Sequence, residues 1–297
     1  MVAGGTGFVG GAIVRELLSR GESVAVLGRD VSRIRAQYGD KVEPRAAYVS
    51  NPQQLQQAMQ GMETVVNAVQ FPNNPIERKS KGYTFEEVDY KGTVNQVDAA
   101  KAAGVKRFVY VSGVGAAADS PYHWFRFKWQ AEKYVENSGL DWAVLRPTWV
   151  FGKGDHALNK LIGFTNFLPF LPLFGDGKQA MQPVYVEDVA KAAADLATKP
   201  DVTGQVYEIG GPQRMSMNEV LQTALQVKGR KRFILHQPVF VGKLLGTIAS
   251  KAPFAPPLTA DAVEFILQPA VADNSALEAK LGTKLTPLRQ GLESYVE

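Results

Sequence analysis

The stretch that decides the fold is MVAGGTGFVG, residues 1–10. Its glycines Gly4, Gly7 and Gly10 follow a short apolar start and precede an amphipathic helical pattern. In a strand–loop–helix unit, such glycines allow a tight turn, a close backbone approach to a pyrophosphate and close packing of the helix on the strand. The helix N-terminus then presents N–H groups and the positive end of its dipole to the phosphates. The stretch therefore predicts a dinucleotide-binding loop, and a plain turn is the alternative.

The strand before this loop is short. Only Met1, Val2 and Ala3 precede Gly4, whereas a strand usually has about five residues. We therefore expect either a truncated first strand or a chain that starts further upstream. No signal peptide is expected before the loop, because its glycines begin so early.

Strand-like and helix-like segments alternate through the first half of the chain. Short apolar runs indicate strands buried on both faces, and helical crossovers between them indicate a parallel sheet. A glycine follows each helical segment, where a helix C-cap favours positive φ. The pattern predicts an α/β fold with a doubly wound parallel sheet of about seven strands. The expected strands are 24–27, 64–69, 107–112 and 142–145, the expected helices are 11–19, 53–59, 93–103 and 125–137, and the glycines are Gly21, Gly61, Gly104 and Gly139.

The rhythm changes after Gly152, where proline and aromatic density rises and regular alternation is lost. A last αβ-like unit at 186–209 indicates that the chain returns to the sheet. We therefore expect a dinucleotide-binding domain and a smaller, interleaved α/β region that forms a lid or binds substrate. Their expected bounds are 1–151, with the last sheet elements added by 180–210, and 152–297.

Composition excludes several classes of site. The 297 residues include no cysteine, which excludes disulfide frameworks, Cys-ligated zinc, iron–sulfur clusters and thiol nucleophiles. His123, His156 and His236 are scattered, so no metal site is expected. The net charge of +4 favours weak attraction to anionic ligands or membranes and argues against nucleic-acid binding. We expect a cytoplasmic protein, with peripheral contact to a membrane as an added alternative.

Two apolar stretches, 157–174 and 238–257, have the composition to be weighed as membrane spans. Lysines and prolines interrupt both, so neither offers the roughly 20 uninterrupted apolar residues that a spanning helix needs. The phenylalanines and prolines of the first stretch form either domain core or a hydrophobic surface for a quinone, isoprenoid or lipid. The compact basic run at 228–232 is interpreted as solvated surface.

Cofactor choice is predicted from the end of the second strand. An NAD site usually places a carboxylate there for the ribose hydroxyls. Here Gly28 leaves room and Arg29 offers a cation, which favours the 2′-phosphate of NADP(H). Asp30 comes one residue later, so NAD(H) stays an alternative, as does an Arg29 that is only an exposed loop residue.

The motifs together resemble those of the short-chain dehydrogenase/reductase superfamily, in its extended and atypical branch, which includes the NAD-dependent epimerase/dehydratase families. The resemblance covers essentially the whole chain and implies a Rossmann fold. Its late part looks most like the group that contains the nucleotide-binding accessory subunit of respiratory complex I and its bacterial relatives. The matching segments are 4–10, 66–69, 108–112, Lys128 with Glu132, 145–152, 182–190, 207–212, 258–261 and 285–288.

The resemblance implies catalytic groups that this sequence lacks. Active members carry a tyrosine four residues before the lysine, but Trp124 stands at that distance from Lys128, and its indole has no proton to exchange in this role. Tyr122 would point to a different face of the helix from Lys128. Gly113 occupies the position of the usual serine, and Ser112 comes one residue early. The catalytic residues are therefore unknown.

The resemblance also implies cofactor contacts. Lys128 is expected to hydrogen-bond the nicotinamide ribose, or to be an exposed helix lysine. Tyr48 and Val49 stand where an Asp–hydrophobic pair usually meets adenine. The full set of expected contacts is Gly4, Thr6, Gly7, Phe8, Val9, Gly10, Arg29, Tyr48, Val49, Ala68, Val69, Ser112, Lys128, Pro147 and Val150.

The sequence thus predicts an NADP(H)-binding, atypical reductase-like protein that is similar to complex I accessory subunits and lacks the usual Tyr and Ser hydroxyls. One alternative is an active NAD(P)-dependent reductase or epimerase that acts on a quinone, isoprenoid or sugar nucleotide. The other is a non-catalytic redox-sensing or assembly subunit that binds the dinucleotide and a protein partner.

Overall fold

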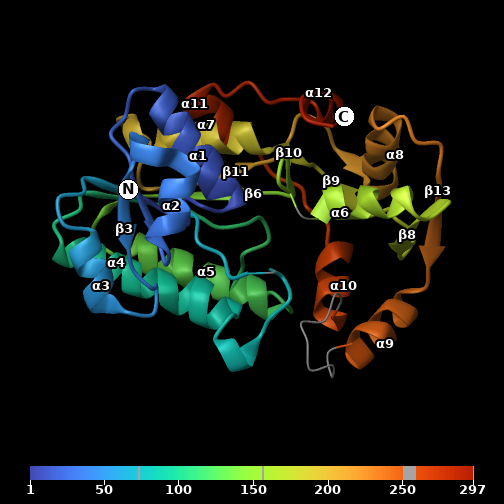
Figure 1. Cartoon of the computed structure of the whole chain (residues 1–297), viewed down its shortest axis with the longest axis horizontal. Coiled ribbons are helices and arrows are strands. Elements are labelled where there is room, and N and C mark those ends of the chain that lie inside the picture. The colour runs from blue at the N-terminus through green and yellow to red at the C-terminus, as the bar shows by residue number, and fades with distance from the viewer. Residues whose placement is uncertain (73, 156, 250–258, 297) are drawn as a thin grey trace.

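The computed structural model describes residues 1–72, 74–155, 157–249 and 259–296. At its centre lies a seven-stranded sheet in which every neighbouring pair is parallel (Figure 1). Its strands are β1 (Val2–Ala3), β2 (Ala25–Gly28), β3 (Glu43–Ala46), β4 (Thr64–Asn67), β5 (Arg107–Val111), β6 (Asp141–Pro147) and β11 (Gln205–Ile209). Their order across the sheet is β11-β6-β5-β4-β1-β2-β3. The predicted doubly wound parallel sheet is confirmed.

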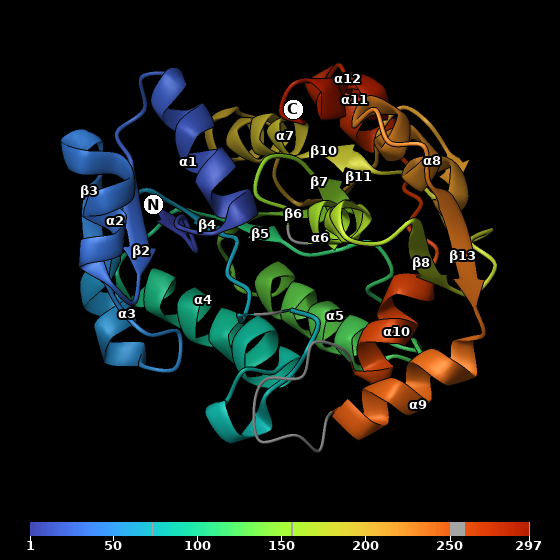
Figure 2. The same cartoon turned by 45° about the vertical axis from the view of Figure 1, so that its right-hand side comes forward.

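Helices cover both faces of the sheet (Figure 2). One apolar core lies between the sheet and α1 (Phe8–Ser19), α2 (Val31–Tyr38) and α7 (Val186–Thr198). A second core lies on the opposite face, under α3 (Pro52–Ala58), α4 (Gly92–Ala102) and α5 (His123–Glu136). Strands buried on both faces explain why the sequence shows continuous apolar runs there.

The four glycines expected at helix ends all have positive φ, between +75° and +80°. A Cβ at any of them would meet no heavy atom within 4 Å. Backbone conformation, and not crowding, therefore accounts for glycine at these positions.

The part of the chain after Gly152 adds small sheets and helices beside the carboxyl edge of the main sheet. Its apolar core includes Phe151, Leu171 and Leu221, all fully buried. Strands pair parallel as β7 with β10 and β8 with β13, and antiparallel as β9 with β12. The remaining elements are β7 (Val150–Phe151), α6 (Ala157–Gly163), β8 (Phe170–Phe174), β9 (Ala180–Met181), β10 (Val184–Tyr185), β12 (Met215–Ser216), α8 (Met217–Val227), β13 (Phe233–Gln237), α9 (Val239–Ala249), α10 (Ala260–Leu267), α11 (Ser275–Leu281) and α12 (Leu288–Glu293), with short 3-10 turns at Gly39–Lys41, Lys79–Lys81 and Phe164–Asn166 and a π-helical turn, η3, at Phe85–Lys91.

Gln182 joins three segments at this edge. Its side-chain amide donates to the carbonyl of Gly211 at 2.7 Å, and its side-chain oxygen accepts from the N–H of Ala272 at 3.0 Å. Its backbone carbonyl accepts from the hydroxyl of Thr148 at 2.5 Å. The segments that follow β6, β11 and α10 are thereby held together by one residue.

Of the two stretches weighed as membrane spans, the structure describes 157–174 in full and 238–257 only as far as Ala249. Within the described residues, no helix is both long and apolar enough to cross a membrane.

Candidate functional site

The parallel sheet brings most of the expected cofactor contacts to one edge. Gly4 follows β1, Arg29 follows β2, Ala68 follows β4 and Ser112 follows β5. Tyr48 and Val49 come shortly after β3, and Pro147 ends β6. Because the strands all run the same way, their carboxyl ends meet at a single edge, where doubly wound sheets bind their ligands.

The glycine loop has the conformation that its sequence requires. Gly4 has φ +78°, and a Cβ there would lie 2.7 Å from the carbonyl oxygen of Ala68. At Gly10 a Cβ would lie 2.3 Å from the carbonyl oxygen of Gly4. The helix packs this closely on the loop only because neither residue has a side chain.

Helix α1 begins with its N–H groups available to a ligand. Gly7 is the N-cap residue, no side chain caps it, and no acidic residue lies in the first turn. Gly7 itself is exposed, so the first turn faces solvent. Uncapped N–H groups at the positive end of a helix dipole bind phosphate. The loop therefore fits the pyrophosphate of a dinucleotide.

The carboxylate and the guanidinium at the end of β2 have different partners. Asp30 is the N-cap of α2, and its carboxylate accepts from the N–H groups of Ser32 at 2.8 Å and Arg33 at 3.3 Å. Arg29 is exposed, and it donates to the hydroxyl of Tyr83 at 3.2 Å. The guanidinium of Arg33 reaches the carbonyl of Thr6 in the glycine loop at 3.5 Å. Two guanidinium groups thus flank this corner of the site, while its carboxylate is used by the backbone.

Lys128 lies inside the protein and is paired with a residue that the sequence did not single out. Its Nζ is 2.8 Å from Oδ1 of Asp89, and the two side chains are 9% and 1% exposed. Asp89 lies on the π-helical turn η3, between β4 and α4. Burial acts to lower the pKa of Lys128, but the attraction of Asp89 outweighs it and raises that pKa above its usual value. Lys128 therefore carries a positive charge at neutral pH, and the alternative of an exposed helix lysine is wrong.

Several buried polar atoms at this edge have no partner within the described residues. They include Oδ2 of Asp89, the hydroxyl of Ser112 and the hydroxyl of Tyr110. Buried polar atoms are normally hydrogen-bonded, and an unpaired one indicates a missing ligand or water. These atoms and Lys128 Nζ offer both donors and acceptors, so the residues present fit the hydroxyl groups of a ribose.

Trp124 is buried in an aromatic cluster. Its ring stacks on Tyr122 with centroids 4.7 Å apart, and it meets the edge of Phe265 from α10 at 5.7 Å. Phe85 and Phe71 complete its buried core. The indole N–H has no partner within the described residues. The position where active relatives place a tyrosine thus belongs to an apolar wall here.

Gly113, at the position of the usual serine, has room for a side chain. A Cβ there would have Cδ and Cε of Lys128 as its nearest neighbours, at 3.7 and 3.8 Å. These are ordinary van der Waals separations. Packing alone therefore does not require glycine.

Lys128 and Glu132, four residues apart on α5, have separate physical roles. Glu132 is fully buried, and its carboxylate accepts hydrogen bonds from Nε and Nη2 of Arg146 on β6, at 2.9 and 2.5 Å. A bidentate pair of this kind fixes the carboxylate and the guanidinium in one plane. Glu132 therefore fastens α5 to the sheet, while Lys128 faces the ligand edge.

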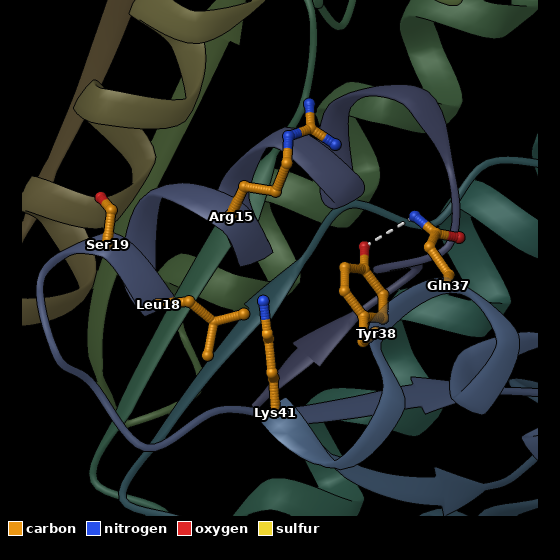
Figure 3. Close-up of a pocket in the computed structure, with 6 residues that line it drawn as sticks. All are labelled: Arg15, Leu18, Ser19, Gln37, Tyr38 and Lys41. Atoms are coloured by element: carbon orange, nitrogen blue, oxygen red, sulfur yellow. Dashed lines mark hydrogen bonds between the residues drawn. The ribbon is translucent and has the colours of Figure 1, made fainter.

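A hollow of about 710 Å³ lies elsewhere, between α1 and α2 (Figure 3). Arg15, Leu18 and Ser19 line it from α1, and Gln37, Tyr38 and Lys41 from the region of α2. None of the expected cofactor contacts lines it. The Tyr38 hydroxyl donates to the carbonyl of Gly5 at 2.5 Å and accepts from Gln37 at 2.8 Å. The Tyr38 hydroxyl therefore anchors the glycine loop at the carbonyl of Gly5, on the side of α2.

Comparison with known proteins agrees with this geometry. Residues 4–200 match a family model described as NAD(P)H-binding. The chain belongs to this NAD(P)H-binding family. Over 296 residues it is 30% identical to mouse NADH dehydrogenase [ubiquinone] 1 alpha subcomplex subunit 9, mitochondrial, covering 97% of this chain and 76% of that protein. It is also 28% identical to the NAD(P)H azoreductase of Xenophilus azovorans over 235 residues, covering 77% of this chain and 74% of that protein.

Solved structures of the NAD(P)H-binding type share the fold. The Escherichia coli NADPH-dependent quinone oxidoreductase QOR2, complexed with NADPH, has a TM-score of 0.75 at 20% identity and covers 100% of this chain and 99% of its own. Citrobacter triphenylmethane reductase complexed with NADP(H) has a TM-score of 0.76 at 21% identity, with 99% and 98% covered. The resemblance to atypical short-chain reductases and to the complex I accessory group is confirmed.

Sequence reasoning missed three members of the site. Asp89 and Tyr83 come from the segment between β4 and α4, which has no strand or helix periodicity to reveal it. Arg33 reaches the glycine loop from α2. The pattern Asp30-Val31-Ser32-Arg33 is an N-cap signal. It would have indicated that the Asp30 carboxylate caps the helix and accepts from its first N–H groups.

Proposed function

We propose that this protein binds NADP(H) across the carboxyl edge of the sheet and is an atypical, reductase-like member of its family. One observation carries the choice of NADP(H): Asp30 is engaged as a helix cap, while the guanidinium of Arg33 reaches the glycine loop at Thr6 and that of Arg29, at the end of β2, contacts only Tyr83 among the described residues. A 2′-phosphate is recognised by such cations, and a ribose 2′-hydroxyl by a free carboxylate.

The contacts that we propose follow the expected set. The pyrophosphate would lie on the first turn of α1, from Gly7 to Gly10, and the nicotinamide ribose on Lys128 and Ser112. Val49 lies beside Gly92, and its carbonyl accepts from Asn95, which supports its place at the adenine end. When bound, the cofactor supplies a hydride for transfer to a substrate. The chain supplies the charged Lys128 and the apolar wall at Trp124.

The substrate that we propose is an apolar molecule, with quinone or isoprenoid as its class. The support is the aromatic cluster around Trp124, together with relatives named as a quinone oxidoreductase and an azoreductase. The proton would come from water or from a side chain other than tyrosine. In the proposed arrangement, residues 1–151 with the elements of 180–210 hold the cofactor and 152–297 hold the substrate. We place the protein in the cytoplasm, in keeping with its lack of cysteine.

We also propose a second candidate function, which one experiment separates from the first. The buried Trp124 and the missing serine hydroxyl at Gly113 favour a non-catalytic subunit that binds the dinucleotide and a protein partner, as the resemblance to complex I accessory subunits suggests. NADPH oxidation by a panel of quinones distinguishes the two. Turnover that Lys128→Ala abolishes favours the reductase, and tight binding with no turnover favours the subunit.

Cofactor choice is tested by titrating the protein with NADPH and NADH and following the quenching of its tryptophan fluorescence. We expect wild type to prefer NADPH. Arg29→Ala and Arg33→Ala should each weaken NADPH binding about 10-fold, since a hydrogen bond to a charged group contributes about 1.5–3 kcal/mol. NADH binding should stay the same. Arg35→Ala, an exposed change on the same helix, is the matched control. Equal or tighter binding of NADH by wild type contradicts the proposal.

A further inference from the structure

The described part of the chain exposes a large apolar surface on α9 and its neighbours. Of its eight exposed large apolar side chains, four lie on α9: Phe240, Leu244, Leu245 and Ile248. Phe240 is 70% exposed and Ile248 is 61% exposed. Monomeric proteins rarely leave such side chains together in water, because exposing each one costs stabilising free energy that burial would provide. The surface therefore indicates contact with something outside the chain.

The spacing on α9 places these side chains on one face. Phe240, Leu244 and Ile248 recur every four residues, and neighbours at that spacing share a helix face. The opposite face is packed against the protein. A Cβ at Gly242 would lie 2.7 Å from the Phe174 ring, and one at Gly246 would lie 2.5 Å from the carbonyl carbon of Thr259. The glycines thus allow α9 to pack closely on its inner side while its outer side stays apolar.

The neighbouring segments extend this apolar surface. Phe233, at the start of β13, is 61% exposed, and Phe167, just before β8, is 88% exposed. Strand β13 pairs with β8 and leads through Pro238 into α9. Both views show β13 and α9 along the outer edge of the molecule, on the side away from β2 and β3 (Figures 1 and 2).

The sequence interval that carries this surface has charged residues of one sign, whereas the neighbouring α10 carries Asp261 and Glu264. No Asp or Glu occurs between Glu219 and Asp261, while that interval contains six Lys and Arg residues. Four of them form the run Lys228, Arg230, Lys231 and Arg232 that leads directly into β13, and none of these four is paired with a carboxylate among the described residues. Lys243 on α9 is paired with Glu264 of α10. These four cations therefore lie next to Phe233, at the other end of β13 from α9, and have no carboxylate partner among the described residues.

An exposed apolar helix face, joined through an exposed strand to a run of unpaired cations, is typical of a surface that lies in a membrane interface. The apolar side chains enter the boundary between headgroups and acyl chains, and the cations attract anionic lipid headgroups. We infer that α9, with Phe233, Phe167 and the basic run 228–232, docks this protein on an anionic lipid bilayer. An acidic protein partner would match the charges but not the breadth of bare aromatic and aliphatic surface.

Docking by this surface would bring the region after Gly152 next to the lipid, where apolar molecules such as quinones dissolve. The inference rests on α9 and its neighbours alone and stands whether or not the protein prefers NADP(H).

The test is co-sedimentation of the full chain with vesicles. We use phosphatidylcholine vesicles and vesicles of phosphatidylcholine mixed with phosphatidylglycerol. Wild type should sediment with the mixed vesicles and much less with the neutral ones. The triple variant Phe240→Ser, Leu244→Ser, Ile248→Ser should bind roughly 100-fold more weakly, because three apolar side chains no longer leave water. Its changes are all at exposed positions, and thermal unfolding checks that it folds.

A charge variant tests the second half of the inference. Lys228→Gln with Lys231→Gln should weaken binding to mixed vesicles about fivefold per lysine, since each cation near an anionic surface contributes about 1 kcal/mol. The matched control changes two exposed lysines elsewhere, Lys101→Gln with Lys178→Gln, and should bind like wild type.

Four results would overturn the inference. Wild type could remain in the supernatant with mixed vesicles, or the triple serine variant could bind them as well as wild type does. The control lysine changes could weaken vesicle binding as much as the changes at Lys228 and Lys231. Finally, wild type could form a dimer that the triple variant converts to a monomer, with no vesicle binding by either. The last result would assign the surface to a second copy of the chain.

Discussion

The Nζ atom of Lys128 lies 2.8 Å from Oδ1 of Asp89, and both side chains are buried. Lys128 comes from the middle of α5 and Asp89 from the π-helical turn that precedes α4. Asp89 is therefore the internal counter-charge of the lysine that family resemblance assigns to the cofactor. Its other carboxylate oxygen has no partner among the described residues, so the pair can accept one more hydrogen bond from a ligand.

Removing this counter-charge should destabilise the protein strongly. Asp89→Asn leaves the Lys128 ammonium buried beside a neutral group, and breaking a buried ion pair costs about 3–5 kcal/mol. We expect the free energy of unfolding in urea to fall by about 3 kcal/mol at neutral pH. The double variant Asp89→Asn, Lys128→Met should recover part of this loss, because no unpaired charge remains. A double variant less stable than the single one would show that the pair is not the cause.

The two missing hydroxyls can be restored separately. A serine at position 113 would meet only the Lys128 side chain, at ordinary distances, so Gly113→Ser should change the free energy of unfolding by about 0.5 kcal/mol or less. Combined with Trp124→Tyr, it should raise NADPH-dependent quinone reduction about 100-fold, the lower end of general acid catalysis. Trp124→Phe with Gly113→Ser removes the indole without adding a phenolic proton and is the matched control. Equal rates for the two double variants would contradict the expectation.

Two glycines of the loop should respond differently to the same change. At Gly10 a methyl group would lie 2.3 Å from a backbone oxygen that has no freedom to move away. Gly10→Ala should therefore lower the free energy of unfolding by about 2–3 kcal/mol, as overpacking does. At Gly7 the nearest atom is 3.2 Å away. This atom is the same carbonyl oxygen of Gly4, in a tight but much milder contact. Gly7→Ala should therefore cost less stability than Gly10→Ala and weaken NADPH binding, since its methyl group lies at the proposed phosphate site. Thermal unfolding and fluorescence titration measure the two effects, and a Gly7→Ala protein that binds like wild type would argue against that site.

Glu77 should make stability depend on pH in the acid range. Burial acts to raise its pKa, but hydrogen bonds from His123 at 3.2 Å and from the N–H of Phe85 at 2.8 Å outweigh it and lower that pKa below the usual 4.5. A lowered pKa in the folded state means that the contribution is present above the usual pKa and is lost as pH falls through the folded value. Glu77→Gln should cost about 1–2 kcal/mol at neutral pH and nearly nothing once the wild-type carboxylate is protonated. Urea unfolding measures this cost at neutral pH and at a pH below the folded-state pKa of Glu77. An equal loss of unfolding free energy at the two pH values would rule out the contribution of the Glu77 charge.

Most strands of the sheet could be predicted because their signals are local. Apolar runs, the glycine loop and the capping glycines such as Gly104 each act within a few residues of one another. Strand β3 was not predicted, because its sequence EPRA is not an apolar run. The order β11-β6-β5-β4-β1-β2-β3 was not predicted either, because the crossover rule fixes the handedness of a connection and not which strands are neighbours.

The ion pair and the small sheets could not be predicted in this way. Lys128 and Asp89 are 39 residues apart, and η3 has no period that places Asp89 on a face. Paired residues of β8 and β13, such as Phe170 and Phe233, are 63 positions apart in the sequence, so neither strand carries a sign of the other. The phenylalanines at 164–174 were open between core and surface. Phe164 and Phe167 are exposed and Phe170 and Phe174 are half-buried, whereas the leucines between them, Leu171 and Leu173, are buried.

Gln182 gives the second half of the chain a property of its own. The chain leaves the sheet edge at Gly211 and returns at Ala270–Ala272, and a single side chain holds both points. Residues 212–249 and 259–269 therefore leave the sheet edge and return to it at a single polar side chain. Losing that amide would remove a side-chain hydrogen bond from both ends of this excursion at once, while β8 and β9 would still hold β13 and β12 by strand pairing.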